Sequence, residues 1–303
     1  MGTIARMAVA LEMDDRGFEK GIASAQRSAE SFSKRLGDLG GKMSLAVTAP
    51  LVGIAGVAVK SAADFEQSMN IMQQVAGATS DEMKSMQKQA LKLGAETAFS
   101  AGEAADAMLE LAKAGMKPMQ VMEAIPGVLD LAAAGGLGLA EAAGVTTAAL
   151  NAFNMAASES GNVANMLAAA ANASASDVTD LGAAVQQGGF AFAAAGQELD
   201  DLVASTAILS NVGLTGSDAG TALKNAMMRL MNPTKEAAEM MAALGINVYD
   251  TQGNMLDWAD VIDEVDRATA GLTDEARNAA LGTIFMSDGM KAMIPLLDEG
   301  KEG

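Results

Sequence analysis

The sequence predicts a mainly α-helical protein of helical hairpins that pack as a bundle, and three observations lead to that prediction. Half of the 303 residues are hydrophobic, yet only 3% are aromatic. The chain also holds 32 Gly and 23 Met. Small residues let helices approach closely, whereas a sandwich or barrel needs many short strands with turns between them. Apolar residues recur every three or four positions along most of the chain, as in amphipathic helices.

Region 1–42 predicts a short N-terminal strand followed by a coiled-coil-like helix. Apolar residues alternate over 4–13, a period of two that is typical of a strand. After Asp15 the spacing changes to alternating steps of four and three, which is the heptad pattern of a partner-helix seam. The seam residues are Phe18, Ile22, Ala25, Ala29, Phe32, Leu36 and Leu39. One amphipathic helix packed inside its own domain explains the same pattern, so both interpretations stay open.

Region 43–60 is an apolar segment between Lys42 and Lys60. Its uncharged stretch, 43–59, is slightly shorter than the roughly 20 residues that span a bilayer as a helix. Two interpretations are open: a segment that inserts into a membrane, and an apolar helix covered by the protein or a partner. The apolar residues on which both depend are Pro50, Leu51, Val52, Ile54, Val57 and Val59.

Region 61–303 predicts a core of helical hairpins joined by Gly turns. Three helix starts resemble capping boxes, in which a hydroxyl and a carboxylate three residues later satisfy free amides: Thr79 with Glu82, Ser100 with Glu103, and Thr215 with Asp218. Pro233 predicts another start, with proline at the first helical position. The helices expected between residues 101 and 230 are 101–114, 119–134, 139–153, 163–171, 177–195, 199–209 and 217–230.

Two further patterns concern the architecture of this core. Ala114-Gly115 matches Ala195-Gly196, and other apolar positions match at the same offset, which indicates two related helical hairpins. A short β-branched run near 246–256, interrupted by a Gly turn, predicts a small β-hairpin before a last pair of helices.

Composition excludes several classes of function. Without His or Cys the chain has no Ser-His or Cys-His nucleophile and no ordinary zinc, haem or iron–sulfur site. The net charge is −18, and residues 118–223 contain no Lys or Arg, so that stretch supplies no basic groove for a phosphate backbone. We therefore expect no enzyme activity, no cofactor, no metal and no direct nucleic-acid binding.

Three local patterns imitate functional motifs but have simpler explanations. Residues 136–141 imitate a dinucleotide-binding turn, but Glu141 replaces the third glycine. Residues 250–254 imitate a calcium loop, but the glycine is displaced and the closing Glu is missing. The carboxylates that could pair for glycoside hydrolysis are better explained as a solvated helix face: Asp257, Asp260, Asp263, Glu264 and Asp266.

Methionines lie at many of the helical seam positions. The simplest interpretation is that they fill irregular gaps in the core, and the alternative is an adaptable partner surface that can repack. The residues concerned are Met69, Met72, Met83, Met86, Met227, Met228, Met240 and Met241.

Several segments of the chain together have a familiar pattern. The longest run extends from Leu93-Gly94 through Thr97-Ala98-Phe99-Ser100 and Glu103–Met108 to Leu111-Ala112-Lys113-Ala114-Gly115. Further segments are 14–18, 42–51, 63–66, 213–223, 229–230 and 244–253. In these segments most of the chain resembles the N-terminal and core region of phage tail tape-measure proteins. None of these segments carries a catalytic motif.

The resemblance implies a structural protein that acts as the ruler for tail assembly, lies inside the tail tube and leaves ahead of the DNA at infection. Implied partners are tail-tube and tail-tip proteins, a tail assembly chaperone, other copies of the chain and the host membrane. A fully helical chain of this length would reach only about 450 Å. Because the family is generally longer, we expect a fragment, a shortened member or the ordered part of a longer chain.

Overall fold

The computed structural model describes residues 62–300. By its internal contacts the chain divides into two units, Met1–Gln67 and Ser68–Gly303. A helix at 62–76 begins the described part, and Met69 and Met72 on it are buried, as their spacing predicts. The predicted strand at 4–13 lies outside the described residues, as do the coiled-coil-like helix and the apolar segment at 43–60.

The described part of the second unit is helical, which confirms the mainly α prediction. The elements after the helix at 62–76 are α4 (Ser80–Glu96), α5 (Ala101–Lys113), α6 (Pro118–Gly135), α7 (Leu139–Ala152), a 3₁₀ turn η1 (Ala157–Glu159), α8 (Ser160–Ala173), α9 (Val178–Ala194), α10 (Leu199–Asn211), α11 (Gly216–Met231), α12 (Lys235–Leu244), α13 (Trp258–Thr269) and α14 (Asp274–Glu299).

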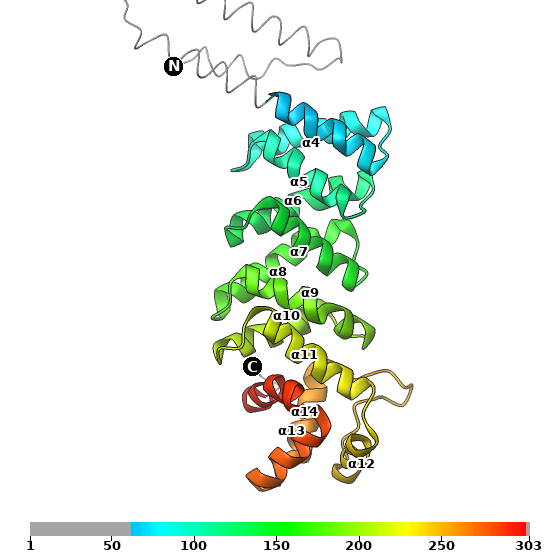
Figure 1. Ribbon diagram of the computed structural model, residues 1–303, viewed down its shortest axis with the longest axis vertical. Coiled ribbons are helices and arrows are strands. Elements are labelled where there is room, and N and C mark those ends of the chain that lie inside the picture. The colour runs from blue at the N-terminus through cyan, green and yellow to red at the C-terminus, as the bar shows by residue number, and fades with distance from the viewer. Residues whose placement is uncertain (1–61, 301–303) are drawn as a thin grey trace, which may run out of the picture. The chain divides into compact units, whose positions relative to one another are not determined.

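Helices α4 to α11 stack in two parallel layers (Figure 1). In one layer α4, α6, α8 and α10 contact one another in order, and in the other α5 contacts α7, α7 contacts α9, and α9 contacts α11. Helices α5, α7, α9 and α11 begin at Ala101, Leu139, Val178 and Gly216, so their starts are almost evenly spaced along the chain. The architecture is therefore a helical solenoid built from two-helix repeats, and the offset from Ala114 to Ala195 corresponds to two of them.

The same turn ends α5, α7 and α9. The amide of Met116 donates to the carbonyl of Leu111 at 3.2 Å, and the corresponding bonds join Met155 to Leu150 at 2.8 Å and Gln197 to Phe192 at 3.0 Å. This bond pattern is the Schellman motif, which needs a residue with positive φ just after the helix. Gly115 and Gly196 supply it, and Asn154 takes the same place in the middle repeat with φ 51°.

Glycines inside the helices control how closely successive repeats pack. Gly182 on α9 lies against Val145 of α7, and Gly220 on α11 lies against the backbone of Ala184 on α9. A Cβ at Gly220 would come within 2.5 Å of the Ala184 carbonyl oxygen, so only glycine fits there. The equivalent residue of α7 is Gly144, and the three glycines are evenly spaced in the sequence.

Proline at position 126 removes a hydrogen-bond donor from the interior of α6, and the packing compensates for it. A helix residue normally donates to the carbonyl four residues earlier, here Met122. That carbonyl instead accepts a 2.7 Å bond from the side-chain amide of Gln89 on α4. A helix defect thus becomes a polar link between neighbouring helices of one layer.

Two of the three predicted capping boxes form. Thr79 with Glu82 and Ser100 with Glu103 exchange both hydrogen bonds, and these bonds lower the pKa of each glutamate. The prediction at Thr215 is wrong, because its side chain makes no cap bond and Gly216 begins α11 with φ 58°.

The expected start of the next helix and the expected β-hairpin also need correction. Helix α12 begins two residues after Pro233, because the hydroxyl of Thr234 accepts from the Ala237 amide and serves as its cap. In the described part, region 246–256 forms a turn closed by one antiparallel bridge between Tyr249 and Met255 and has no paired strands. The Asp250 side chain takes the amides of Gln252 and Asn254 into the turn, and the carbonyl of Leu256 accepts from the side chain of Gln197, between α9 and α10, at 3.1 Å.

Candidate functional site

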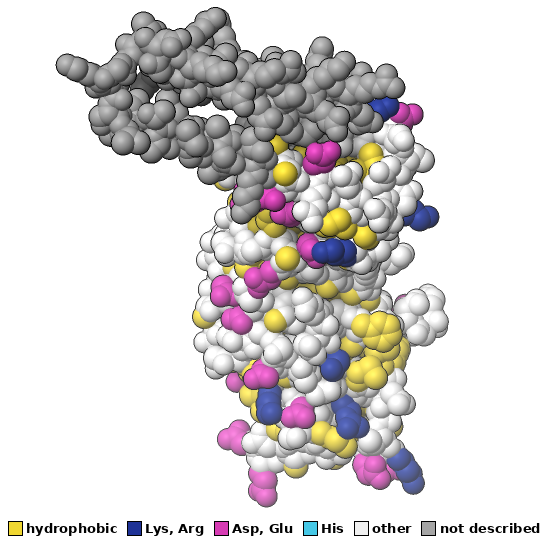
Figure 2. Space-filling model, turned by 45° about the horizontal axis from the view of Figure 1, so that its top comes forward, with side chains coloured by type: hydrophobic (Ala, Val, Ile, Leu, Met, Phe, Trp, Pro, Cys, Tyr) yellow, Lys and Arg dark blue, Asp and Glu magenta, His cyan; other side chains and the backbone are white. Residues whose placement is uncertain are grey.

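One surface feature of the solenoid is an apolar groove across its last two repeats. Phe190 on α9 is 78% exposed and Met228 on α11 is 48% exposed. They line a groove of about 480 Å³ together with Ala191, Lys224, Asn225, Arg229 and Asn232. Figure 2 shows hydrophobic side chains gathered on one face of this unit with Lys and Arg side chains beside them.

The groove is a product of the repeat. Phe190 and Met228 are separated by the same interval as Gly182 and Gly220, so they take equivalent positions on neighbouring helices of one layer. The sequence predicts Met228 as either a gap filler or part of a partner surface, and its exposure supports the second interpretation. Reasoning from the sequence missed Phe190, although the regular recurrence of glycine could have placed it beside Met228.

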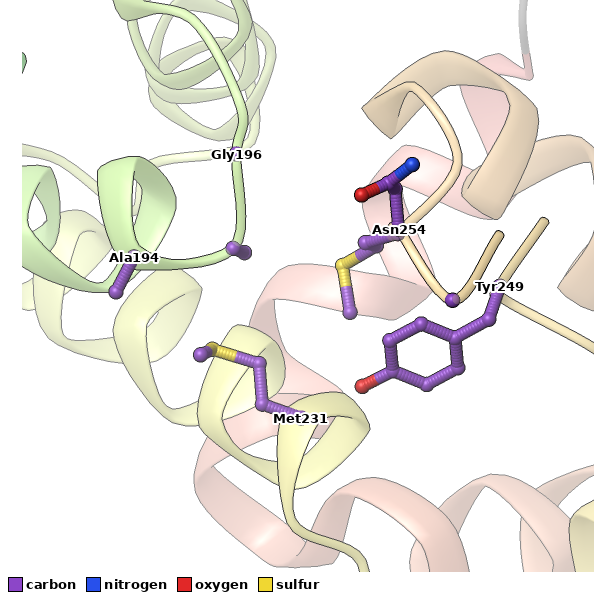
Figure 3. A pocket seen from close by; sticks show the side chains of 8 residues that line it. Ala194, Gly196, Met231, Tyr249 and Asn254 are labelled. Carbon is purple, nitrogen blue, oxygen red and sulfur yellow. The ribbon is translucent and has the colours of Figure 1, made fainter. Parts of the chain in front are cut away.

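A second pocket, of about 460 Å³, lies where the solenoid meets the turn at 246–256 (Figure 3). Met231 of α11 and Tyr249 of the turn point toward it, and Asn254 of the turn lines it, opposite Ala194 and Gly196 at the end of α9. The Tyr249 hydroxyl donates to the Leu230 carbonyl at 3.5 Å. Its lining residues include no carboxylate or amine, so it offers a shape and a few polar atoms but no acid–base pair.

One aromatic cluster joins the turn region to the solenoid. The buried Trp258 packs edge-to-face on Phe192 of α9 with ring centroids 5.2 Å apart. Its indole Nε1–H donates to the hydroxyl of Ser205 on α10 at 2.8 Å. Edge-to-face pairs and satisfied indole donors stabilise a buried contact, so this cluster is structural.

The motif-like patterns are structural where the structure describes them. Gly136 ends α6 and Gly138 caps α7, so the glycines of 136–141 join two helices rather than a strand and a helix. The side chain of Asp250 accepts bonds from the amides of Gln252 and Asn254, both at 2.8 Å. Although desolvation opposes it, this bonding lowers the pKa of Asp250 and explains the turn without a cation.

Two carboxylates of α13 are engaged in ion pairs. Asp266 pairs with Arg277 of α14 at 2.9 Å, and Glu264 pairs with Arg267 one turn along the helix. Within residues 62–300 no group of three or more carboxylates has the geometry to hold a metal ion. A more unusual carboxyl group is that of Asp201, whose pKa is raised by desolvation and by the negative charges of Asp200, Glu198 and Asp257.

The predicted site residues at the N-terminus lie outside the described residues. They are the seam (Phe18, Ile22, Ala25, Ala29, Phe32, Leu36, Leu39) and the apolar segment (Pro50, Leu51, Val52, Ile54, Val57, Val59). Among the described helices, none has by itself the length and apolarity of a membrane span. Helices α6 and α7 pass that test only as a pair bent by 119°.

Comparison with known proteins identifies the family. Residues 87–285 match the family described as phage-related minor tail protein. The chain is 39% identical over 280 residues to the tape measure protein of Pneumococcus phage Dp-1, which covers 92% of this chain and 24% of that protein. It is 27% identical over 270 residues to the probable tape measure protein of Escherichia phage P2, covering 83% of this chain and 33% of that protein.

No solved structure matches the chain. The chain spans about a quarter of one curated relative and a third of the other. The matched region runs from α4 into α14 and so includes the solenoid and its groove. These matches confirm the resemblance found in the sequence, and the chain belongs to the phage-related minor tail protein family, as a relative of tape measure proteins.

Proposed function

We propose that this chain is the N-terminal and core part of a tape measure that occupies the lumen of the phage tail tube. In this role it sets the length of the tail during assembly and leaves ahead of the DNA. The supporting observation is the 39% identity to a tape measure protein over 92% of the chain. The chain's acidic character is consistent with the role, because a net charge of −18 limits adhesion to the DNA that follows.

The partners in this proposal are other tail components: the tube, the tail tip, an assembly chaperone and further copies of the chain. A structural role also agrees with the pockets, because neither brings an acid–base pair together. The proposal assigns no catalytic step to the described residues.

A deletion in the phage that encodes this chain tests the ruler role. Removing residues 139–177 takes out one two-helix repeat, from the start of α7 to the residue before α9. If each residue adds the rise of an extended helix, the tail shortens by about 58 Å. If the repeat counts in its packed form, the tail shortens by about one helix diameter, roughly 10 Å. Electron microscopy of the tails measures the difference, and unchanged tails would contradict a ruler role for this region.

The N-terminal seam forms part of the same proposal. Phe18, Ile22, Ala25, Ala29, Phe32, Leu36 and Leu39 face a helix of another chain, because their heptad spacing persists longer than a compact bundle requires. Replacing Ile22 and Leu36 with Asp places charges in the seam and should abolish association. An unchanged sedimentation profile would contradict the seam.

A further inference from the structure

The apolar groove formed by Phe190, Met228 and the polar residues around them differs in charge from the rest of the described surface. Most exposed cations there pair with a carboxylate three or four residues away on their own helix, as Lys84 does with Asp81 and Lys113 with Glu110. Lys224 and Arg229 are two of four described cations that take part in no ion pair, with Lys88 and Lys117 as the others.

The sequence of α11 explains why these two cations are free. The positions three and four residues from Lys224 hold Gly220, Thr221, Met227 and Met228, and none of them carries a carboxylate. The same positions around Arg229 hold Asn225, Ala226, Asn232 and Pro233. The chain thus carries two unpaired positive charges beside an exposed aromatic ring, although its net charge is −18.

The helical geometry places the two cations on opposite sides of the apolar centre. At about 100° per residue, Met228 lies about 40° around α11 from Lys224 and about 100° from Arg229. Phe190, from the neighbouring helix α9, extends the apolar centre across the groove. The groove therefore presents an apolar strip with a cation on each flank.

We propose that this groove binds an amphipathic helix of another protein, whose apolar stripe is flanked by Glu or Asp on both sides. The apolar stripe covers Phe190 and Met228, and the flanking carboxylates pair with Lys224 and Arg229. Docking of an amphipathic helix in an apolar groove is a common mode of recognition, and flanking charges select the partner. The inference depends on the groove alone and stands whether or not the chain acts as a ruler.

Charge complementarity favours an acidic protein segment over a nucleic acid. The affinity of a protein for a phosphate backbone rises with the number of phosphates that its cations neutralise. Only two cations line the groove, so it is poorly suited to a nucleic acid. Lys224 and Arg229 lie about 140° apart around α11, so the carboxylates that pair with them lie on opposite sides of the partner's apolar stripe.

Fluorescence anisotropy with the full chain and a labelled synthetic helix tests the proposal. In this probe Leu recurs every three or four residues and Glu flanks the Leu stripe on both sides; a second probe carries Lys in place of Glu. We expect saturable binding of the Glu probe only. The double variant Lys224→Glu/Arg229→Glu should weaken it at least tenfold, and Phe190→Ala should weaken it several-fold. Added salt should weaken binding because it screens the ion pairs.

Lys88→Glu/Lys117→Glu is the matched control, because it makes the same change in net charge at the other two unpaired cations. Equal loss in both double variants, or no saturable binding of the Glu probe, would overturn the proposal. So would tighter binding of a labelled single-stranded oligonucleotide. A second copy of the chain could also occupy the groove, and sedimentation of the chain alone tests this. If the chain self-associates and only Lys224→Glu/Arg229→Glu abolishes the association, the occupant is a second copy and the proposal of a different protein is overturned. Circular dichroism verifies that each variant is folded.

Discussion

The regular stack from α5 to α11 and α13 in the C-terminal region are packed differently. In the stack, small residues recur at fixed intervals and helices touch through glycine, as at Gly182 and Gly220. In the C-terminal region the interval is lost: α14 still packs on α11 through Gly289, but α13 is anchored by the largest buried side chain, Trp258. Terminal repeats of solenoids are often atypical because they close the stack. The comparison teaches that close contact through glycine extends to α14, whereas the position of α13 depends on a bulky side chain.

Removing the bulk at the end should have the largest effect. Trp258→Ala creates a cavity beside Phe192 and leaves the Ser205 hydroxyl without its donor, so we expect a loss of about 4 kcal/mol in the free energy of unfolding. Denaturant unfolding followed by circular dichroism measures it. Trp258→Phe keeps a six-membered ring against Phe192 but removes the indole N–H and part of the ring volume, so its loss should be smaller. Equal losses would mean that the hydrogen bond, rather than bulk, fixes this end.

Adding bulk within the stack should have the next largest effect. The new methyl group of Gly220→Ala would lie 2.5 Å from the Ala184 carbonyl oxygen and 2.6 Å from its Cα, both backbone atoms that cannot rotate away. We expect a loss of about 2 kcal/mol. Gly144→Ala is the matched control at the corresponding position of α7, where a Cβ meets no atom within 4 Å.

That control should change stability in the opposite direction. Alanine is favoured over glycine inside a helix by roughly 0.5–1 kcal/mol, and Gly144→Ala has nothing to offset this gain. A gain at residue 144 with a loss at residue 220, measured by thermal unfolding, would confirm that close packing is confined to particular repeats. Losses at both positions would contradict the comparison.

Relieving strain in the C-terminal region should have a smaller, stabilising effect. Met286 interrupts α14 with φ 55° and ψ −178°, a conformation that is nearly restricted to glycine. Met286 is also 42% exposed, so its side chain contributes little packing. Met286→Gly should therefore stabilise the protein by about 1 kcal/mol. The adjacent Ser287→Gly, within the helical part of α14, should destabilise it instead; stabilisation by both would show that position 286 is not special.

The smallest expected effect concerns Asp201, at the start of α10 in the stack. Desolvation raises its folded-state pKa above the ordinary 3.8, so ionisation at this position opposes folding as pH rises through the folded pKa. Asp201→Asn should therefore stabilise the protein at neutral pH by about 0.5 kcal/mol, as chemical denaturation would measure. Well below pH 3.8 the carboxyl is protonated in both states and the two proteins should converge. Asp130→Asn removes the same charge at an exposed position and is the control for the change in net charge.

Much of the fold follows from local patterns in the sequence. The apolar spacing of α4 and the capping boxes at Thr79 and Ser100 depend only on neighbouring residues, so they are predictable. The β-hairpin prediction is wrong because pairing is limited to one bridge, Tyr249 with Met255, and the Asp250 side chain takes the amides of Gln252 and Asn254 into a turn. Helix α12 starts after Thr234 rather than at Pro233, because the Thr234 hydroxyl accepts from the Ala237 amide and caps the helix.

The candidate surface was less predictable for a related reason. Exposure of Phe190 and Met228 depends on how the repeats stack, and apolar spacing alone places such residues in a core. The sequence does contain a signal for this stacking, the even spacing of Gly144, Gly182 and Gly220. This spacing is a shorter period than the offset between Ala114-Gly115 and Ala195-Gly196. A search for that shorter period would have aligned the two exposed side chains.

The two-layer stack also determines how the chain responds to a pulling force. Each helix of the stack makes its main contacts with its nearest neighbours, so no strong contact ties α4 to α11. Tension applied across the stack acts on every boundary, and because each boundary holds only neighbouring repeats, we expect the repeats to detach one after another rather than together. A two-helix repeat that detaches changes from a packed pair of helices to an extended length of chain. We therefore expect the solenoid to lengthen in steps of one repeat under tension.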